Sequence, residues 1–188
     1  MAQFEEITAA LQAAHWPPFL RHALNTNGMS RFPAAQYEMV RLGIGLYGLG
    51  DETMAPYLLP ALRLKAKLTA VRELPPASSV GYGRRGRLPN GGRIGVLSIG
   101  YADGLPRKAG EGRFNVRLGR SEAPILGAVC MDMCMVDLSH LPSAQVGDEV
   151  LIFGPEHPIA LLAKAAETIP YEILTGIGER VHRVYISE

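Results

Sequence analysis

A stretch with strict two-residue alternation is the feature that most constrains the fold of this chain. Residues 61–74 read ALRLKAKLTAVREL, in which leucine and alanine alternate with arginine, lysine and threonine from Leu62 to Ala70. Successive side chains of a β-strand point to opposite faces, so one face of this segment is apolar and the other is polar. The pattern predicts a half-buried strand that packs on a core through one face.

Further strand patterns follow and make the C-terminal two thirds of the chain mainly β. They are RIGVLSIGYADG (93–104), RFNVRLGRSEAPILGAVCMDMCMVDLS (113–139) and VGDEVLIFG (146–154). The second of these is a predicted hairpin, with Gly119 and Arg120 near its turn. We also expect a short helix at 158–169 and a closing strand at 179–186. Residues 58–188 are therefore expected to form a small antiparallel barrel or sandwich.

The first 50 residues have a different pattern, in which predicted helices alternate with extended segments. The helices are at 3–14 and 30–40, and the extended segments are RHALNTNG (21–28) and the glycine-punctuated RLGIGLYGLG (41–50). The second helix is expected to start at Ser30 as its N-cap. Alternating helices and strands are typical of layered or barrel α/β folds, but two of each cannot close a barrel. The polar, proline-containing residues 51–57 are the expected linker.

Composition and charge exclude several classes of protein. With a net charge of +1, the chain has no strong electrostatic field that would attract nucleic acid. The basic residues Arg84, Arg85, Arg87 and Arg93 also lack the interleaved aromatic residues that are typical of a nucleic-acid-binding surface. No segment approaches the roughly 20 apolar residues of a membrane span, and the N-terminus has no signal-peptide pattern. The only cysteines, Cys130 and Cys134, suit neither a disulfide framework nor a zinc site, so we expect both to be buried. A cytoplasmic location is expected.

The segment SSVGYGRRG (78–86) places Tyr82 between two glycines and just before two arginines. Glycine permits backbone conformations and close approaches that other residues cannot adopt. Two interpretations are open on this segment alone. Tyr82 is either an exposed residue of a glycine-rich hairpin turn or a phenol presented to a ligand.

Several motifs, in matching order along the chain, resemble those of the alanine racemase family. They are HALNTNG (22–28), MVRLGIGLYG (39–48), VGYGRR (80–85), GYADG (100–104), GAVCMDMCMVDLS (127–139) and VGDEVLIFG (146–154). Members of this family use pyridoxal phosphate (PLP) and have an N-terminal (β/α)₈ barrel and a C-terminal β domain. The resemblance covers residues 1–188. It implies that residues 1–50 are the last α/β units of an incomplete PLP-binding barrel. The ending at 171–185 is most similar to racemases fused behind a cell-wall ligase.

The resemblance implies the interconversion of L- and D-alanine for peptidoglycan precursors, with one base on each face of Cα. Tyr82 stands at the position of one base. Arg41 resembles the arginine that faces the pyridine nitrogen of PLP, with His22 behind it as an orienting group. Asn25, Thr26 and the backbone amides of Gly43 and Ile44 resemble the phosphate-binding group.

Tyr101 and Met131 resemble the residues that narrow the substrate entry and contact the substrate carboxylate. In this family the active site is shared within a homodimer. The β domain of one subunit supplies the residues at the positions of Tyr82, Tyr101 and Met131 to the cofactor bound by the other.

Two positions depart from the family pattern. Glu179 stands where many relatives have a tyrosine that contacts the phosphate, so that contact is not expected here, and Glu179 is expected to point away or to pair with Arg180 or Arg183. None of the four lysines (Lys65, Lys67, Lys108 and Lys164) lies in a motif like that of the PLP-binding lysine. We therefore expect a C-terminal fragment that is inactive by itself. The alternative is a non-catalytic β domain for dimerisation or binding, in which Tyr82 is a contact residue.

Overall fold

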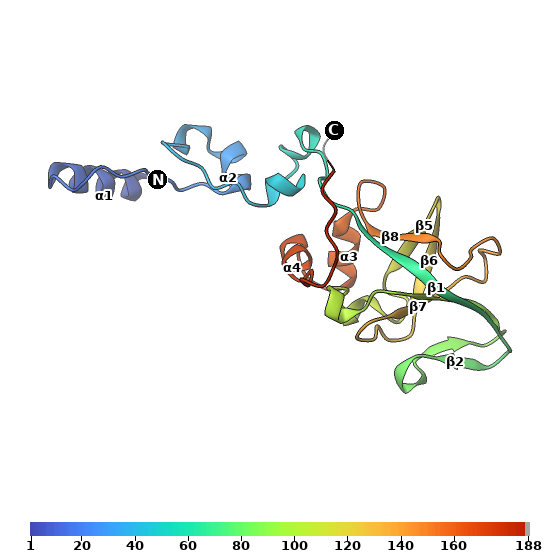
Figure 1. The fold of residues 1–188 in the computed structure, drawn as a ribbon. Coiled ribbons are helices and arrows are strands. Elements are labelled where there is room, and N and C mark those ends of the chain that lie inside the picture. The colour runs from blue at the N-terminus through green and yellow to red at the C-terminus, as the bar shows by residue number, and fades with distance from the viewer. Residues whose placement is uncertain (187–188) are drawn as a thin grey trace. The chain divides into compact units, whose positions relative to one another are not determined.

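The computed structural model describes residues 1–186 (Figure 1). The chain divides into two compact units, Met1–Ala61 and the residues from Leu62 onward. Each unit is described by itself.

The second unit is a closed six-stranded barrel, which decides between the barrel and the sandwich. Its neighbouring strands are all antiparallel and follow the order β1-β4-β7-β6-β5-β8. The strands are β1 (Leu64–Leu74), β4 (Gly92–Leu97), β5 (Asn115–Leu118), β6 (Ser121–Leu126), β7 (Cys134–Asp137) and β8 (Glu149–Phe153). The strands predicted around residues 61–74, 93–104, 113–139 and 146–154 are all confirmed.

Strand β1 shows why the alternation specifies the barrel. Leu64, Ala66 and Leu68 are buried, whereas Lys65 and Lys67 between them are exposed. Lys65 reaches across to the neighbouring strand and pairs with a carboxylate of β8, Glu149, at 2.6 Å. Apolar side chains from all six strands fill the interior, and the removal of each large one from water contributes about 1.5–3 kcal/mol. The fully buried set includes Leu68, Leu97, Val116, Ile125, Val136 and Ile152.

A two-stranded ribbon leaves the barrel after β1 and returns to it at β4, seen as the green hairpin in Figure 1. It consists of β2 (Ser78–Val80) and β3 (Gly86–Leu88), paired antiparallel. Val80 and Leu88 pack with Ile94 of β4 and Met135 of β7. This small core fixes the ribbon to the barrel.

The helices that follow the barrel differ in part from expectation. Helix α3 (Ile159–Ala165) was predicted, whereas α4 (Pro170–Thr175), a six-residue helix with proline at its first position, was missed. The closing strand predicted at 179–186 was wrong, since these residues form no strand. A closed barrel offers no free edge for another strand to join.

Of the two cysteines, Cys134 is buried, and burial raises the pKa of its thiol to about 12. Cys130 is partly exposed, contrary to expectation.

In the first unit, helix α1 (Ala2–Ala13) is confirmed but the next two elements differ from the prediction. Helix α2 spans Thr26–Arg31, because the side chain of Asn25 caps it by accepting a hydrogen bond from the Gly28 amide at 2.9 Å. The expected N-cap, Ser30, lies inside this helix. The expected strand at 41–50 is a single parallel bridge between Arg41 and Asn25, followed by a 3₁₀ helix at Ile44–Tyr47. Shorter 3₁₀ helices lie at Pro33–Ala35 and Ala55–Tyr57.

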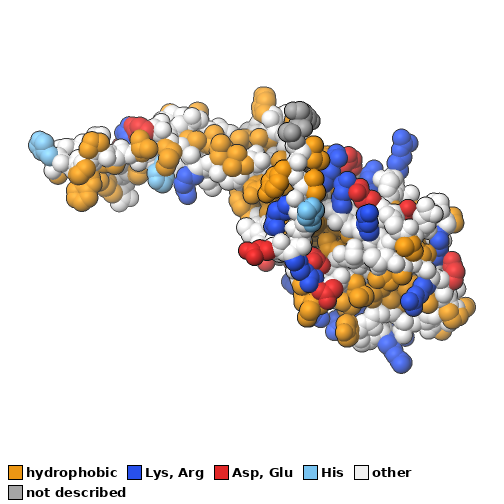
Figure 2. All heavy atoms as spheres, in the orientation of Figure 1, with side chains coloured by type: hydrophobic (Ala, Val, Ile, Leu, Met, Phe, Trp, Pro, Cys, Tyr) orange, Lys and Arg blue, Asp and Glu red, His pale blue; other side chains and the backbone are white. Residues whose placement is uncertain are grey.

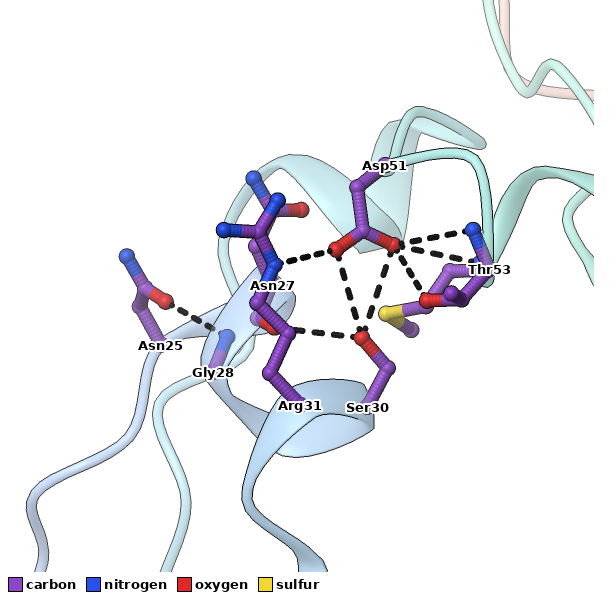
Figure 3. A network of polar contacts seen from close by, with 8 residues as sticks. Asn25, Asn27, Gly28, Ser30, Arg31, Asp51 and Thr53 are labelled. Atoms are coloured by element: carbon purple, nitrogen blue, oxygen red, sulfur yellow. Dashed lines mark hydrogen bonds and ion pairs between the residues drawn. The ribbon is translucent and has the colours of Figure 1, made fainter.

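Asp51 ties helix α2 to the end of this unit (Figure 3). Its carboxylate accepts hydrogen bonds from the Thr53 hydroxyl at 2.6 Å and from Nε of Arg31 at 2.9 Å. The backbone amides of Thr53 and Met54 also donate to it, each at 3.2 Å. The Thr53 hydroxyl, with Arg31 in support, lowers the pKa of Asp51 to about 2. The negative charge of Asp51 is thus the centre of the network.

The surface of the first unit carries many large apolar side chains, which Figure 2 shows as orange atoms spread over its visible face. The more exposed include Trp16, Leu20, Phe32, Leu42 and Leu46. Within residues 1–186, no helix is long and apolar enough to cross a lipid bilayer.

Candidate functional site

The nine residues singled out from the sequence fall into two groups, one in each unit. His22, Asn25, Thr26, Arg41, Gly43 and Ile44 belong to the first unit, and Tyr82, Tyr101 and Met131 belong to the second. In the part of the chain that the structure describes, no group of three or more histidine, cysteine or acidic side chains could hold a metal ion.

Thr26 organises the first group. Its side chain is 1% exposed, and its hydroxyl oxygen accepts hydrogen bonds from the amides of Gly43 at 3.1 Å and Gly45 at 3.2 Å. A side chain at position 45 would place Cβ 2.8 Å from Cγ2 of Thr26, so glycine is required for this approach. The start of α2 and the LGIG turn are thereby held together.

Arg41 and Asn25 lie side by side through their parallel bridge. The Arg41 amide donates to the carbonyl of Leu24 at 3.0 Å, and its Nη2 donates to the carbonyl of Ala23 at 3.3 Å. His22 is exposed, and no hydrogen bond between it and Arg41 occurs within residues 1–186. The orienting role of His22 therefore stays a prediction.

Replacing Thr26 with valine is expected to destabilise the first unit by about 2 kcal/mol. Valine keeps the shape of threonine but leaves the amides of Gly43 and Gly45 without their acceptor, at about 1 kcal/mol for each lost bond. Thr26→Ser retains the hydroxyl and is the matched control. Hydrogen exchange of the amides of residues 43–48 measures the effect. Equal exchange in the valine and serine variants would show that the hydroxyl does not hold the turn.

Tyr82 lies at the tip of the ribbon, in a 3₁₀ turn (Tyr82–Arg84) between β2 and β3. Gly81 and Gly83 have φ angles of +76° and +65°, a region that favours glycine. A Cβ at position 81 would also lie 2.9 Å from Cε of Met135. The turn leaves Tyr82 75% exposed, and within residues 1–186 its hydroxyl has no hydrogen-bond partner. The sequence of this turn thus presents the phenol outward.

Tyr101 and Met131 lie on two loops that are joined backbone to backbone. The amide of Tyr101 donates to the carbonyl of Cys130 at 2.9 Å, and the amide of Ala102 donates to that of Met131 at 3.0 Å. A Cβ on Gly100 would lie 2.3 Å from the Met131 oxygen, so only glycine fits there. Both side chains are partly exposed, Tyr101 by 40% and Met131 by 53%.

The three predicted residues of the second unit gather around one stretch of chain. Gly81, next to Tyr82, lies against Met135 and Ala128, and Gly100, next to Tyr101, lies against Cys130 and Met131. Residues 128–135 therefore contact both tyrosine-bearing turns. Of two surface hollows on this unit, of about 570 and 500 Å³, the first adjoins the Tyr82 turn through Arg85, Gly86 and Arg87, but none of the nine residues lines either of them. The side chains of Tyr82, Tyr101 and Met131 thus lie on an open surface of this unit.

Sequence reasoning missed three charged residues at these loops. Arg180 donates from Nε to Asp103 at 2.7 Å and from Nη2 to Asp132 at 2.6 Å. Asp103 lies in the GYADG motif and Asp132 in the CMDM motif, which was the signal available in the sequence. Of the two arginines that were expected as partners of Glu179, Arg180 thus pairs with Asp103 and Asp132 instead.

Comparison with known proteins gives two family matches. The model described as the N-terminal domain of alanine racemase matches residues 1–51, and the model described as its C-terminal domain matches residues 61–185. Among curated relatives, the alanine racemase of Desulfovibrio desulfuricans is 41% identical over 100% of this chain and 52% of its own length. That of Treponema pallidum is 39% identical over 89% of this chain and 47% of its own length.

Solved structures of alanine racemases have the same fold as this chain, and the chain matches about half of each of them. The alanine racemase of Streptomyces coelicolor superimposes with a TM-score of 0.91 at 35% identity, over 100% of this chain and 51% of its own. That of Bartonella henselae, solved with covalently bound pyridoxal phosphate, has a TM-score of 0.86 at 30% identity, over 98% and 51%. The chain thus spans about half the length of the relatives that it matches. Two consecutive domain matches, in the order found in its relatives, show that the chain belongs to the alanine racemase family.

Proposed function

We propose that this chain is part of an alanine racemase, a PLP-dependent isomerase that interconverts L- and D-alanine. The observation that carries the proposal is the turn at Tyr82. Two glycines with left-handed backbone conformations hold an exposed phenol beside the loops of Tyr101 and Met131, in a β domain that matches the family. A turn built only for chain reversal needs no such side chain.

Racemisation requires that one proton be removed from Cα and another be returned on the opposite face. Tyr82 is the proposed base on one face. PLP supplies the electron sink that makes the proton on Cα removable. The second base is expected from the half of the relatives that this chain does not match, since no lysine here lies in the family's motif.

The residues of the first unit fit the cofactor's phosphate. The buried Thr26 hydroxyl accepts the amide protons of Gly43 and Gly45 and so fixes the shape of the turn that would hold the phosphate. The Ile44 amide has no hydrogen-bond partner within residues 1–186, and no atom lies within 4 Å of the Cβ position of Gly43. An anion can therefore approach this turn. Arg41, on the neighbouring bridge, is the proposed partner of the pyridine nitrogen, and since arginine keeps its proton it does not protonate the ring.

The exposed loops of the second unit fit an amino-acid substrate. The amide of Met131 has no partner in the described chain and is the proposed donor to the substrate carboxylate, with Tyr101 narrowing the entry. The openness of this site supports a homodimer in which the β domain of one subunit completes the active site of the other. With its two cysteines free, the chain suits the reducing cytoplasm, where D-alanine enters peptidoglycan precursors.

A hybrid enzyme tests the proposal. The half of the Desulfovibrio desulfuricans racemase that this chain matches is replaced by residues 1–188, and racemisation of L-alanine is measured with and without PLP. We expect PLP-dependent racemisation. A folded, dimeric hybrid that binds PLP but does not racemise alanine would contradict the proposal and favour a domain that serves only dimerisation or binding.

A further inference from the structure

A single guanidinium joins the two loops that carry Tyr101 and Met131. Arg180 donates from Nε to Oδ1 of Asp103 at 2.7 Å and from Nη2 to Oδ1 of Asp132 at 2.6 Å. Asp103 lies two residues after Tyr101, and Asp132 follows Met131 directly. Charge-assisted hydrogen bonds of this length are among the stronger polar contacts in proteins. The planar guanidinium therefore bridges the two loops, in addition to the backbone hydrogen bonds between them.

The backbone around Arg180 is itself closely packed on the first of these loops. The Gly178 amide donates to the carbonyl of Asp103 at 3.3 Å. A Cβ on Gly104 would lie 2.7 Å from the oxygen of Gly176, and one on Gly178 would lie 2.8 Å from the oxygen of Ala102. Arg180 thus extends from a fixed segment rather than from a free chain end.

The two carboxylates also carry charge close to the proposed substrate position. The Asp103 side chain is 15% exposed and its second oxygen accepts the Gly100 amide at 2.8 Å, whereas Asp132 is 56% exposed. Met131, whose amide is the proposed donor to the substrate carboxylate, is the immediate neighbour of Asp132. Without a cation, Asp132 would repel a bound carboxylate at short range.

We propose that Arg180 is a positioning residue of the racemase site, which holds the Tyr101 and Met131 loops in register and neutralises Asp132 beside the substrate carboxylate. The loop-holding part depends only on contacts within the second unit. The charge-neutralising part rests on the proposed function, because it needs an amino-acid substrate at Met131.

Hydrogen exchange in the 188-residue chain tests the first part. In Arg180→Gln, the amides of Tyr101 and Ala102 are expected to exchange at least about tenfold faster, while those of the barrel strands are unchanged. Arg63→Gln is the matched control, since Arg63 pairs with Glu156 at 3.0 Å and is similarly exposed but touches neither loop. Unchanged exchange at residues 101 and 102 in Arg180→Gln would overturn the positioning role.

Kinetics of the hybrid racemase test the second part. Arg180→Gln is expected to raise KM for L-alanine about tenfold, the size expected for one uncompensated charge, with a smaller change in kcat. Adding Asp132→Asn should return KM to within about threefold of the parent, because the repelling charge is gone. Arg180→Lys keeps the charge without the two-pronged geometry and should give an intermediate KM.

The outcomes distinguish a failure of the neutralising role of Arg180 from a failure of the proposed racemase function. A failure of Asp132→Asn to lower the raised KM would overturn the neutralising role while leaving racemisation in place. If the parent hybrid is inactive, the proposed function fails and takes the neutralising role with it. The exchange experiment still decides whether Arg180 holds the loops.

Discussion

Tyr82→Phe is expected to lower kcat of the hybrid racemase by about a thousandfold, the central value for the loss of a positioned general base. The substitution removes one oxygen from a side chain that is 75% exposed and has no hydrogen-bond partner within residues 1–186. The fold should therefore be unaffected, and the backbone of Gly81 and Gly83 will still form the turn. Steady-state racemisation in both directions, with circular dichroism to check folding, measures the effect.

Tyr171→Phe in α4 is the control, because Tyr171 is also partly exposed but lies outside the site. A second readout distinguishes the loss of one base from general damage. With one base missing, the other can still exchange the α-proton with solvent, so exchange in D₂O should persist for one alanine enantiomer and fall for the other. If both enantiomers exchange and racemise at the parent rate in Tyr82→Phe, the proposed base is wrong.

The barrel could be predicted from the sequence because its signal is local. The alternation in β1 identifies the side chains that face the core. Gly119 indicates the turn between β5 and β6, where its φ angle is +57°. The expected closing strand at 179–186 failed because barrel closure is a property of all six strands together. An apolar, extended segment has the local features of a strand but no edge with which to pair.

The first unit was harder to predict because competing caps lie a few residues apart. Both Asn25 and Ser30 are good N-cap residues, and the choice depends on the bridge between Asn25 and Arg41, which pairs residues far apart in the chain. The glycines at 43 and 45 suit a strand end as well as a 3₁₀ turn. What decides between these is the buried hydroxyl of Thr26, a tertiary contact.

The site shows the same division between local and distant signals. The glycines around Tyr82 and before Tyr101 are local features that the sequence displays. The contacts of Arg180 are not, because its partners lie 77 and 48 residues away. The expected pairing of Arg180 with Glu179 is a local one, whereas the pairing that the structure has joins Arg180 to Asp103 and Asp132.

Gly100→Ala is expected to destabilise the barrel unit by about 3 kcal/mol, near the upper end for overpacking. Gly100 is buried and its φ angle is −142°, which alanine adopts readily, so the cost is steric rather than conformational. The new Cβ would lie 2.3 Å from the oxygen of Met131 and 2.4 Å from that of Cys130. Neither carbonyl can move away freely, because each accepts a hydrogen bond, that of Cys130 from the Tyr101 amide and that of Met131 from the Ala102 amide.

Gly119→Ala is the matched control for this prediction. Gly119 has a positive φ angle but no atom within 4 Å of its Cβ position, so alanine there costs only the conformational strain, about 1 kcal/mol. The slowest-exchanging amides of β4 and β7 report the unfolding free energy of the barrel unit for both variants. A cost at Gly100 no greater than that at Gly119 would mean that the two loops separate easily. The contact between them would then be too weak to place Tyr101 beside Met131, and Arg180 alone would have to hold them.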